Sequence, residues 1–111
     1  MATQIDMNVF NTLKESTGAD FIRDLIDTFL DDAPNQLTQM RSALKAKDAD
    51  SLRRAAHSMK SNAATFGAME LSSQARELES LARENNLEIG NRLEVMSETF
   101  RQISIQLNAL K

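Results

Sequence analysis

Apolar side chains recur along most of the chain at steps of four and three residues. Spacing of this kind places them on one stripe of an α-helix. No stretch shows the strict alternation typical of a half-buried strand. The pattern therefore predicts four amphipathic helices, whose stripes are Ile22, Ile26, Phe29, Ala33, Leu37, Met40 and Leu44; Leu52, Ala56, Met59, Ala63 and Phe66; Leu71, Ala75, Leu78 and Ala82; and Ile89, Leu93, Met96, Phe100, Ile103, Leu107 and Leu110.

Residues that favour helix ends lie between these stripes. Asp side chains cap helix starts, and Gly or Asn commonly ends a helix because both tolerate the left-handed conformation. Pro34 lies inside the first stripe, and we expect it to kink that helix because the apolar spacing continues across it in phase. The expected starts are Asp6, before a short helix with Val9, Phe10 and Leu13, and Asp48 or Asp50; the expected ends are near Gly18, at Gly67 and at Asn85–Asn86.

Four helices with one apolar stripe each have one economical arrangement, in which the stripes face inward. Short connections favour neighbouring antiparallel helices. We therefore expect an all-α fold, an antiparallel up-down-up-down four-helix bundle with a short extra N-terminal helix over one end. The 111 residues suit one domain, and we take residues 1–111 as that domain.

Composition narrows the possible functions. The chain has no Cys, which excludes disulfides, thiolate metal sites and a nucleophilic thiol. A net charge of −3 argues against nucleic-acid binding. No apolar run approaches the ~20 residues that span a bilayer, and the N-terminus lacks the features of a secretory signal. We expect a soluble, cytoplasmic monomer without a metal site, in which carboxylate pairs such as Asp31–Asp32 and Glu77 with Glu79 are solvated.

His57 is the only histidine and the main candidate for chemistry. At ~100° per residue it lies about 140° from the centre of the Leu52–Phe66 stripe, on the outer flank of its helix. Arg53, Lys60, Ser61 and Ala64 share that face. An exposed imidazole beside cations and small side chains suits the approach of a protein that carries an anion. The alternative is an ordinary surface histidine among ordinary surface charges.

The sequence around His57 resembles the signature of histidine-containing phosphotransfer (HPt) domains. Residues 56–68 read AHSMKSNAATFGA, with His, then Lys three residues on, small residues, and Gly-Ala at the helix end. The segments FLDDAP at 29–34 and LSSQARELE at 71–79 also resemble that family. The family usually has Gly directly after the Lys, where this chain has Ser61, which leaves slightly less room beside the histidine.

The resemblance implies that His57 accepts a phosphoryl group from a receiver-domain aspartate and passes it to another receiver. The expected partners are receiver domains of response regulators or hybrid histidine kinases, which would bring their own Mg²⁺, and the chain would lack autonomous ATP-dependent kinase activity. The alternative function is a helical interaction module that binds a signalling partner without phosphate.

The resemblance also assigns roles around His57. Lys60 is expected to neutralise phosphoryl charge, and Arg53 and Arg54 to steer an acidic partner. Ser61 and Ala64 are expected to give clearance. The remaining partner-binding candidates are Gly67, which ends the helix, and Arg76, Glu79 and Arg83, which share one flank of the next helix and are expected either to border the histidine or to be solvated.

Overall fold

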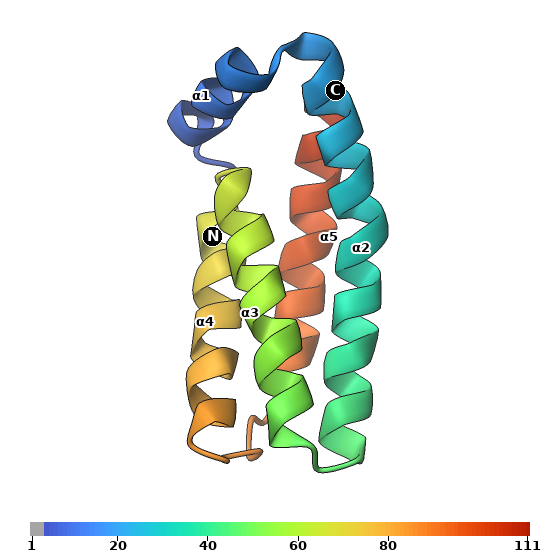
Figure 1. Cartoon of the computed structure of the whole chain (residues 1–111), viewed down its shortest axis with the longest axis vertical. Helices are drawn as coiled ribbons and strands as arrows, with labels where there is room; N and C mark the ends of the chain where they lie inside the picture. Colours follow the sequence, from blue (N-terminus) through green and yellow to red (C-terminus); the bar gives the residue numbers. More distant parts are fainter. Residues whose placement is uncertain (1–3) are drawn as a thin grey trace.

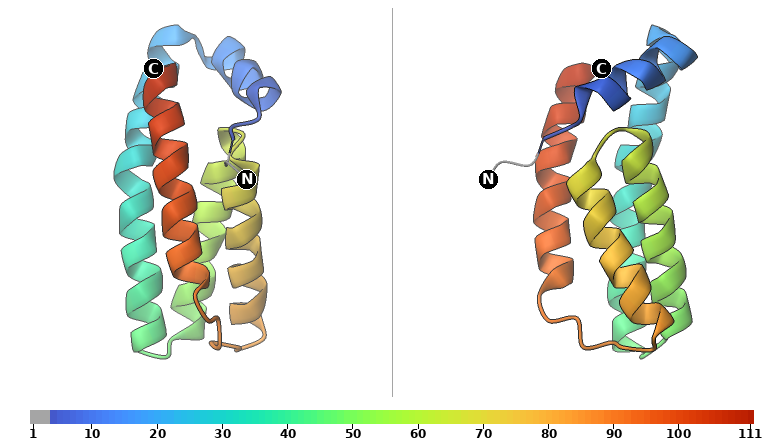
Figure 2. Two further views of the ribbon diagram at one scale, coloured as in Figure 1. Left: turned by 180° about the vertical axis from the view of Figure 1, so that it is seen from behind. Right: turned by 90° about the vertical axis from the view of Figure 1, so that its left-hand side faces the viewer.

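The computed structural model describes residues 4–111, and these form five helices without a strand. The helices are α1 (Met7–Thr17), α2 (Ala19–Lys45), α3 (Ala49–Thr65), α4 (Met69–Arg83) and α5 (Arg92–Leu110). Helices α2 to α5 are antiparallel neighbours that run down, up, down and up in the view of Figure 1, and α5 closes the ring against α2. The short α1 lies across the end of the bundle where α2 begins (Figure 2). The expected bundle with an extra N-terminal helix is confirmed.

The predicted stripes form the core. Met40, Met59 and Met96, one from each of three helices, have no exposed surface. Phe29 lies 5.1 Å from Phe66 and 5.8 Å from Phe100 between ring centroids, which joins α2, the end of α3 and α5. None of the helices in residues 4–111 combines the length and apolar character needed to cross a bilayer.

Most predicted boundaries agree with the structure. The Asp6 carboxylate accepts hydrogen bonds from the backbone N–H groups of Asn8 and Val9, and Asp48, not Asp50, caps α3. Helix α2 continues through Pro34 as one element, so the proline does not open a new helix. The start of the last helix was predicted too early. Ile89 lies in the loop between α4 and α5, and its side chain is buried in the core although it is not part of a helix.

The N-terminal segment fastens the turn between α3 and α4 to the rest of the bundle. The Asp6 N–H donates to the Gly67 carbonyl oxygen at 2.8 Å, and the Ile5 N–H donates to Gln106 Oε1 of α5 at 2.8 Å. Gly67 has a φ of 83°, and a Cβ there would lie 2.6 Å from the Asp6 carbonyl oxygen. Only glycine therefore fits both the backbone conformation and the close approach at this turn.

Candidate functional site

His57 lies midway along α3, on the face that points away from the core. Its side chain is 56% exposed, as the helical spacing predicted. Helix α4 packs along α3, and this packing places Glu79 beside the imidazole, with 2.6 Å between His57 Nδ1 and Glu79 Oε2. One ring nitrogen is therefore tied to α4, and Nε2 is the nitrogen left for chemistry.

Glu79 is a buried carboxylate at the centre of the site, with only 3% of the residue exposed. The expectation that it is solvated is wrong. Three side chains surround it: Lys60 Nζ at 2.6 Å from Oε1, His57 Nδ1 at 2.6 Å from Oε2, and Arg83 Nη2 at 3.4 Å from Oε2. A buried charge persists only when such partners compensate for its lost hydration.

These contacts determine the charge of Glu79 and the tautomer of the neutral His57 ring. The hydrogen bond from Lys60 holds the pKa of Glu79 below its usual value, with a further contribution from His57 and against the opposing effect of burial. An ionised carboxylate can only accept hydrogen bonds. His57 Nδ1 must therefore carry the proton, and in the neutral ring Nε2 then holds the free lone pair.

Lys60 directs its ammonium at Glu79 and is only 29% exposed. Its backbone carbonyl accepts a hydrogen bond from Ser72 Oγ of α4 at 2.9 Å, a second link between the two helices next to the site. Lys60 is thus next to the imidazole, as expected, but in this structure its charge is shared with a buried carboxylate.

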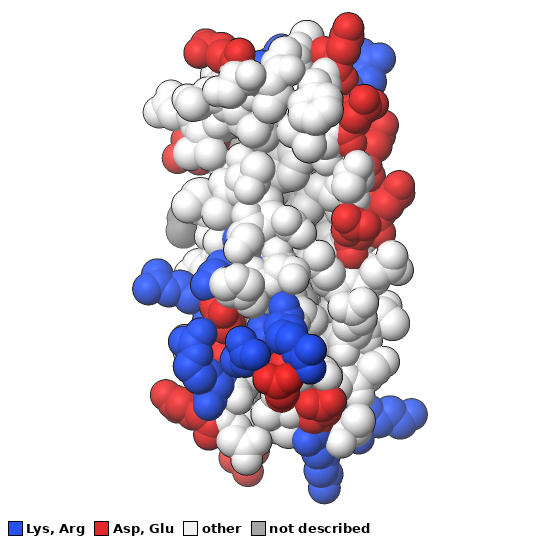
Figure 3. All heavy atoms as spheres, viewed as in Figure 1, with Lys and Arg blue, Asp and Glu red and all other residues white. Residues whose placement is uncertain are grey.

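The two arginines before His57 share one acidic partner. Arg53 Nη2 lies 3.0 Å from Asp50, and Arg54 Nη2 lies 2.6 Å from the same carboxylate. The two arginines with Asp50 therefore carry one net positive charge. Figure 3 shows basic side chains gathered over the lower halves of α3 and α4, whereas acidic side chains lie along the upper half of α2 on the same face.

The small residues that follow His57 border a hollow between α3 and α4. We call it the α3–α4 hollow; its lining residues are Lys60, Ser61, Ala64, Met69, Ser72, Ser73 and Arg76, and its volume is about 470 Å³. Ser61 and Ala64 line this hollow, and their role in giving clearance beside His57 stays a prediction. Gly67 is instead buried beneath Asp6, so it shapes the helix end and offers no surface to a partner.

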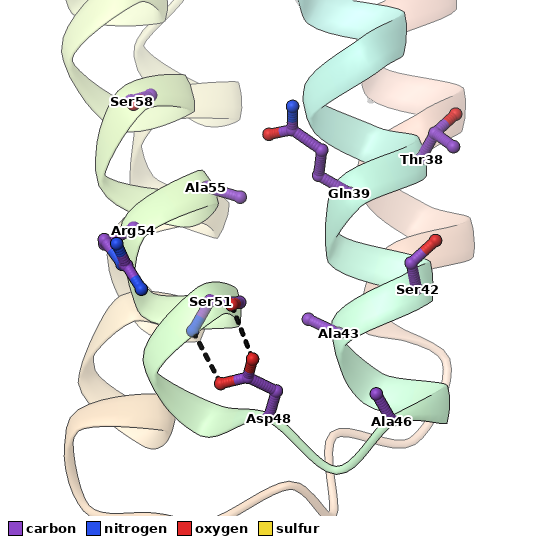
Figure 4. Close-up of a pocket in the computed structure, with 10 residues that line it drawn as sticks. All are labelled: Thr38, Gln39, Ser42, Ala43, Ala46, Asp48, Ser51, Arg54, Ala55 and Ser58. Atoms are coloured by element: carbon purple, nitrogen blue, oxygen red, sulfur yellow. Dashed lines mark hydrogen bonds between the residues drawn. The ribbon is translucent and has the colours of Figure 1, made fainter.

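A second hollow lies on the other side of α3, between α2 and α3. It is lined mainly by small and hydroxyl side chains (Figure 4). Two of its lining residues, Arg54 and Ser58, lie three residues before His57 and directly after it. Asp48 spans its lower end by accepting hydrogen bonds from Ser51, at 3.1 Å from the backbone N and 2.6 Å from Oγ. His57 therefore lies on α3 between the two hollows.

Of the residues that the sequence singled out, the structure leaves His57, Ser61 and Arg76 exposed and Lys60 and Ala64 half-buried, whereas the burial of Glu79 was missed. A signal was present. Glu79 lies four residues after Ala75 and three before Ala82, both in the apolar stripe of α4. A charged residue with this spacing flanks the buried face and needs a partner there.

The carboxylate beside His57 is already occupied by hydrogen bonds and is not free to bind a metal ion. Both oxygens of Glu79 already accept hydrogen bonds from nitrogen donors. No group of three His, Cys, Asp or Glu side chains within the described part of the chain is arranged to hold a metal ion.

Comparisons with known proteins identify the family and agree with the overall fold. The family model of the Hpt domain matches residues 24–111. The crystal structure of histidine-containing phosphotransfer protein B (HptB) from Pseudomonas aeruginosa PAO1 superimposes with a TM-score of 0.88 at 32% sequence identity, covering 98% of this chain and 95% of that chain. A search of curated proteins found no match.

Proposed function

The chain belongs to the Hpt domain family and is a histidine phosphotransfer protein of a phosphorelay, and we propose that His57 carries the phosphoryl group. The observation that carries this proposal is the half-exposed imidazole whose Nδ1 is bonded to buried Glu79. This arrangement leaves Nε2 as an exposed nucleophile with a fixed orientation.

Hpt proteins work with receiver domains, so the donor is the acyl phosphate of a receiver aspartate. The Nε2 lone pair of His57 attacks phosphorus, a P–N bond forms, and the P–O bond to the aspartate breaks. The aspartate leaves as a carboxylate with the electron pair of that bond. Phosphoryl transfer depends mainly on such in-line positioning and on charge stabilisation. The reverse sequence passes the group to a second receiver.

No proton has to move in this step, because the Nδ1 proton remains in its hydrogen bond to Glu79. The ring acquires positive charge as Nε2 becomes bonded to phosphorus. The Glu79 carboxylate, 2.6 Å from Nδ1, stabilises that charge. Glu79 is therefore a positioning residue that also compensates charge in the product.

Lys60 has two possible acceptors once the phosphoryl group arrives. Its ammonium is a compact charge on a flexible stem with three donors. It can retain Glu79 and donate to a phosphoryl oxygen at the same time, which neutralises part of the added charge. Arg53 and Arg54, which share Asp50, add a smaller attraction that salt weakens.

In this proposal the receiver supplies Mg²⁺ together with its own acidic residues. Receivers of response regulators or of hybrid histidine kinases would both provide this chemistry. A cytoplasmic location and a monomeric state, as expected from the sequence, complete the proposal.

Incubation with a phosphorylated receiver domain, followed by intact-mass analysis at neutral and acid pH, tests the proposal. We expect an acid-labile phosphate on the wild-type chain and none on His57→Gln. Phosphate on both proteins would move the modification to another residue. Receiver binding without phosphate on either protein would favour the interaction-module function instead.

A further inference from the structure

Among the residues that the structure describes, Arg76 is a basic side chain near the site without an ion-pair partner. Arg53 and Arg54 pair with Asp50, and Lys60 and Arg83 pair with Glu79. Arg76 is exposed and makes no ion pair or side-chain hydrogen bond within residues 4–111. An unpaired guanidinium is available to a carboxylate, which it can bind through two parallel hydrogen bonds.

Arg76 also borders the α3–α4 hollow. The other lining groups are the small residues Ser61, Ala64, Ser72 and Ser73, with Lys60 and Met69 at the sides. Ser61 and Ala64 follow His57 by one and two helical turns on the same face. A protein that brings an aspartyl phosphate to His57 therefore lies close to this hollow.

We infer that the α3–α4 hollow receives an acidic side chain of the receiver, and that Arg76 binds its carboxylate. This inference rests on the proposed function, because the occupant belongs to the same partner that exchanges the phosphoryl group. Charge complementarity supports this occupant, since the hollow is lined by two cations and no carboxylate; Lys60 is paired with Glu79, and Arg76 has no ion-pair partner within residues 4–111. The contact gives Arg76 a role in partner specificity separate from the chemistry at Nε2.

The test compares two phosphoryl donors. One is a receiver domain, phosphorylated with acetyl phosphate and Mg²⁺, that transfers to the wild-type chain. The other is phosphoramidate, from which Nε2 displaces ammonia as a P–N bond forms, with no protein docking. The quantity measured is the ratio of kcat/KM with the receiver to the rate constant with phosphoramidate.

We expect Arg76→Glu to lower this ratio about tenfold or more, because a charge reversal slows association with an acidic partner. The matched control is Arg101→Glu, the same charge change on α5, the helix diagonally opposite α3 in the bundle. We expect its ratio to equal that of the wild type. The receiver reaction of the wild type should also fall more steeply with salt than that of Arg76→Glu.

An unchanged ratio in Arg76→Glu would overturn the inference, whether both rates stay constant or both fall together. An equal loss in Arg101→Glu would overturn it too, since the effect would then come from net charge. Failure of the proposed function looks different: neither donor would place phosphate on the wild-type chain beyond the level found for His57→Gln.

Discussion

Replacing Glu79 by Gln removes the charge at the centre of the site while keeping the shape of the side chain. Lys60 can only donate hydrogen bonds, so the amide oxygen of the new residue should turn towards its ammonium. The amide NH₂ group then faces His57 Nδ1. A donor in that place requires Nδ1 to accept, which moves the imidazole proton to Nε2 and removes the nucleophilic lone pair.

The size of the effect follows from the contact that is lost. The bond between Nδ1 and the carboxylate, at 2.6 Å, is a charge-assisted hydrogen bond. A hydrogen bond to a charged group contributes about 1.5–3 kcal/mol, and about 1.4 kcal/mol corresponds to a factor of ten. We therefore expect Glu79→Gln to lower the phosphotransfer rate by about ten- to hundredfold.

Single-turnover transfer from a phosphorylated receiver measures the rate, and ¹⁵N chemical shifts of the only imidazole report which ring nitrogen carries the proton. The matched control is Glu77→Gln on the same helix, because Glu77 is exposed and pairs with Arg92 away from the site. We expect control and wild type to agree in both measurements. A Glu79→Gln variant with the wild-type rate and an unprotonated Nε2 would refute the reasoning.

Other changes test separate parts of the structure. His57→Gln should abolish phosphate uptake and lower the free energy of unfolding by at most about 3 kcal/mol, because the half-exposed side chain loses little packing besides its hydrogen bond to buried Glu79; urea unfolding checks the second part. Lys60→Ala should slow transfer and shorten the lifetime of phosphohistidine, and unchanged values would remove its assigned role. Gly67→Ala should lower the free energy of unfolding by more than about 2 kcal/mol, because about 1–2 kcal/mol of left-handed strain adds to a clash with the N-terminal segment. Gly90→Ala should lower it less, because Gly90 has a φ of 57° but no atom near a new Cβ; urea unfolding compares the two variants. The lowered pKa of Glu79 gives a pH dependence: its stabilisation is present above the unfolded-state pKa and is lost as the pH falls through the lowered folded-state pKa. As the pH falls below the unfolded-state pKa, the wild type should therefore lose more stability than Glu79→Gln, and urea unfolding at a series of pH values measures the difference.

The sequence predicted the bundle well because each helix has to bury one apolar stripe. Spacing alone identified the inner faces of α2, α3 and α4 and the exposure of His57. It misplaced Ile89, which continues the apolar period of α5 but lies in the preceding loop. The spacing of apolar residues indicates which side chains are buried. A buried loop residue can continue that spacing just as a helical residue does.

The site was less predictable because its centre depends on how α3 and α4 face each other. Which side chain of α4 meets His57 is a property of helix packing and not of either helix alone. The pair of Glu79 and Arg83, four residues apart on α4, can be read from one helix, but the contacts of Glu79 with His57 and Lys60 of α3 cannot. The local sequence therefore predicts the nucleophile, and the tertiary structure adds the group that orients it.

The hydrogen bond between Ile5 and Gln106 has a bearing on the order in which the molecule folds. It joins residues 101 positions apart, whereas α3 and α4 form a hairpin of neighbours in the chain. Closing a long loop costs more conformational entropy than pairing adjacent helices, so the N-terminal contact should form late and open early. Amide hydrogen exchange should accordingly be fast at residues 5 and 6 and slow in α3. The helix that presents the histidine would then be among the last parts of the molecule to lose its structure.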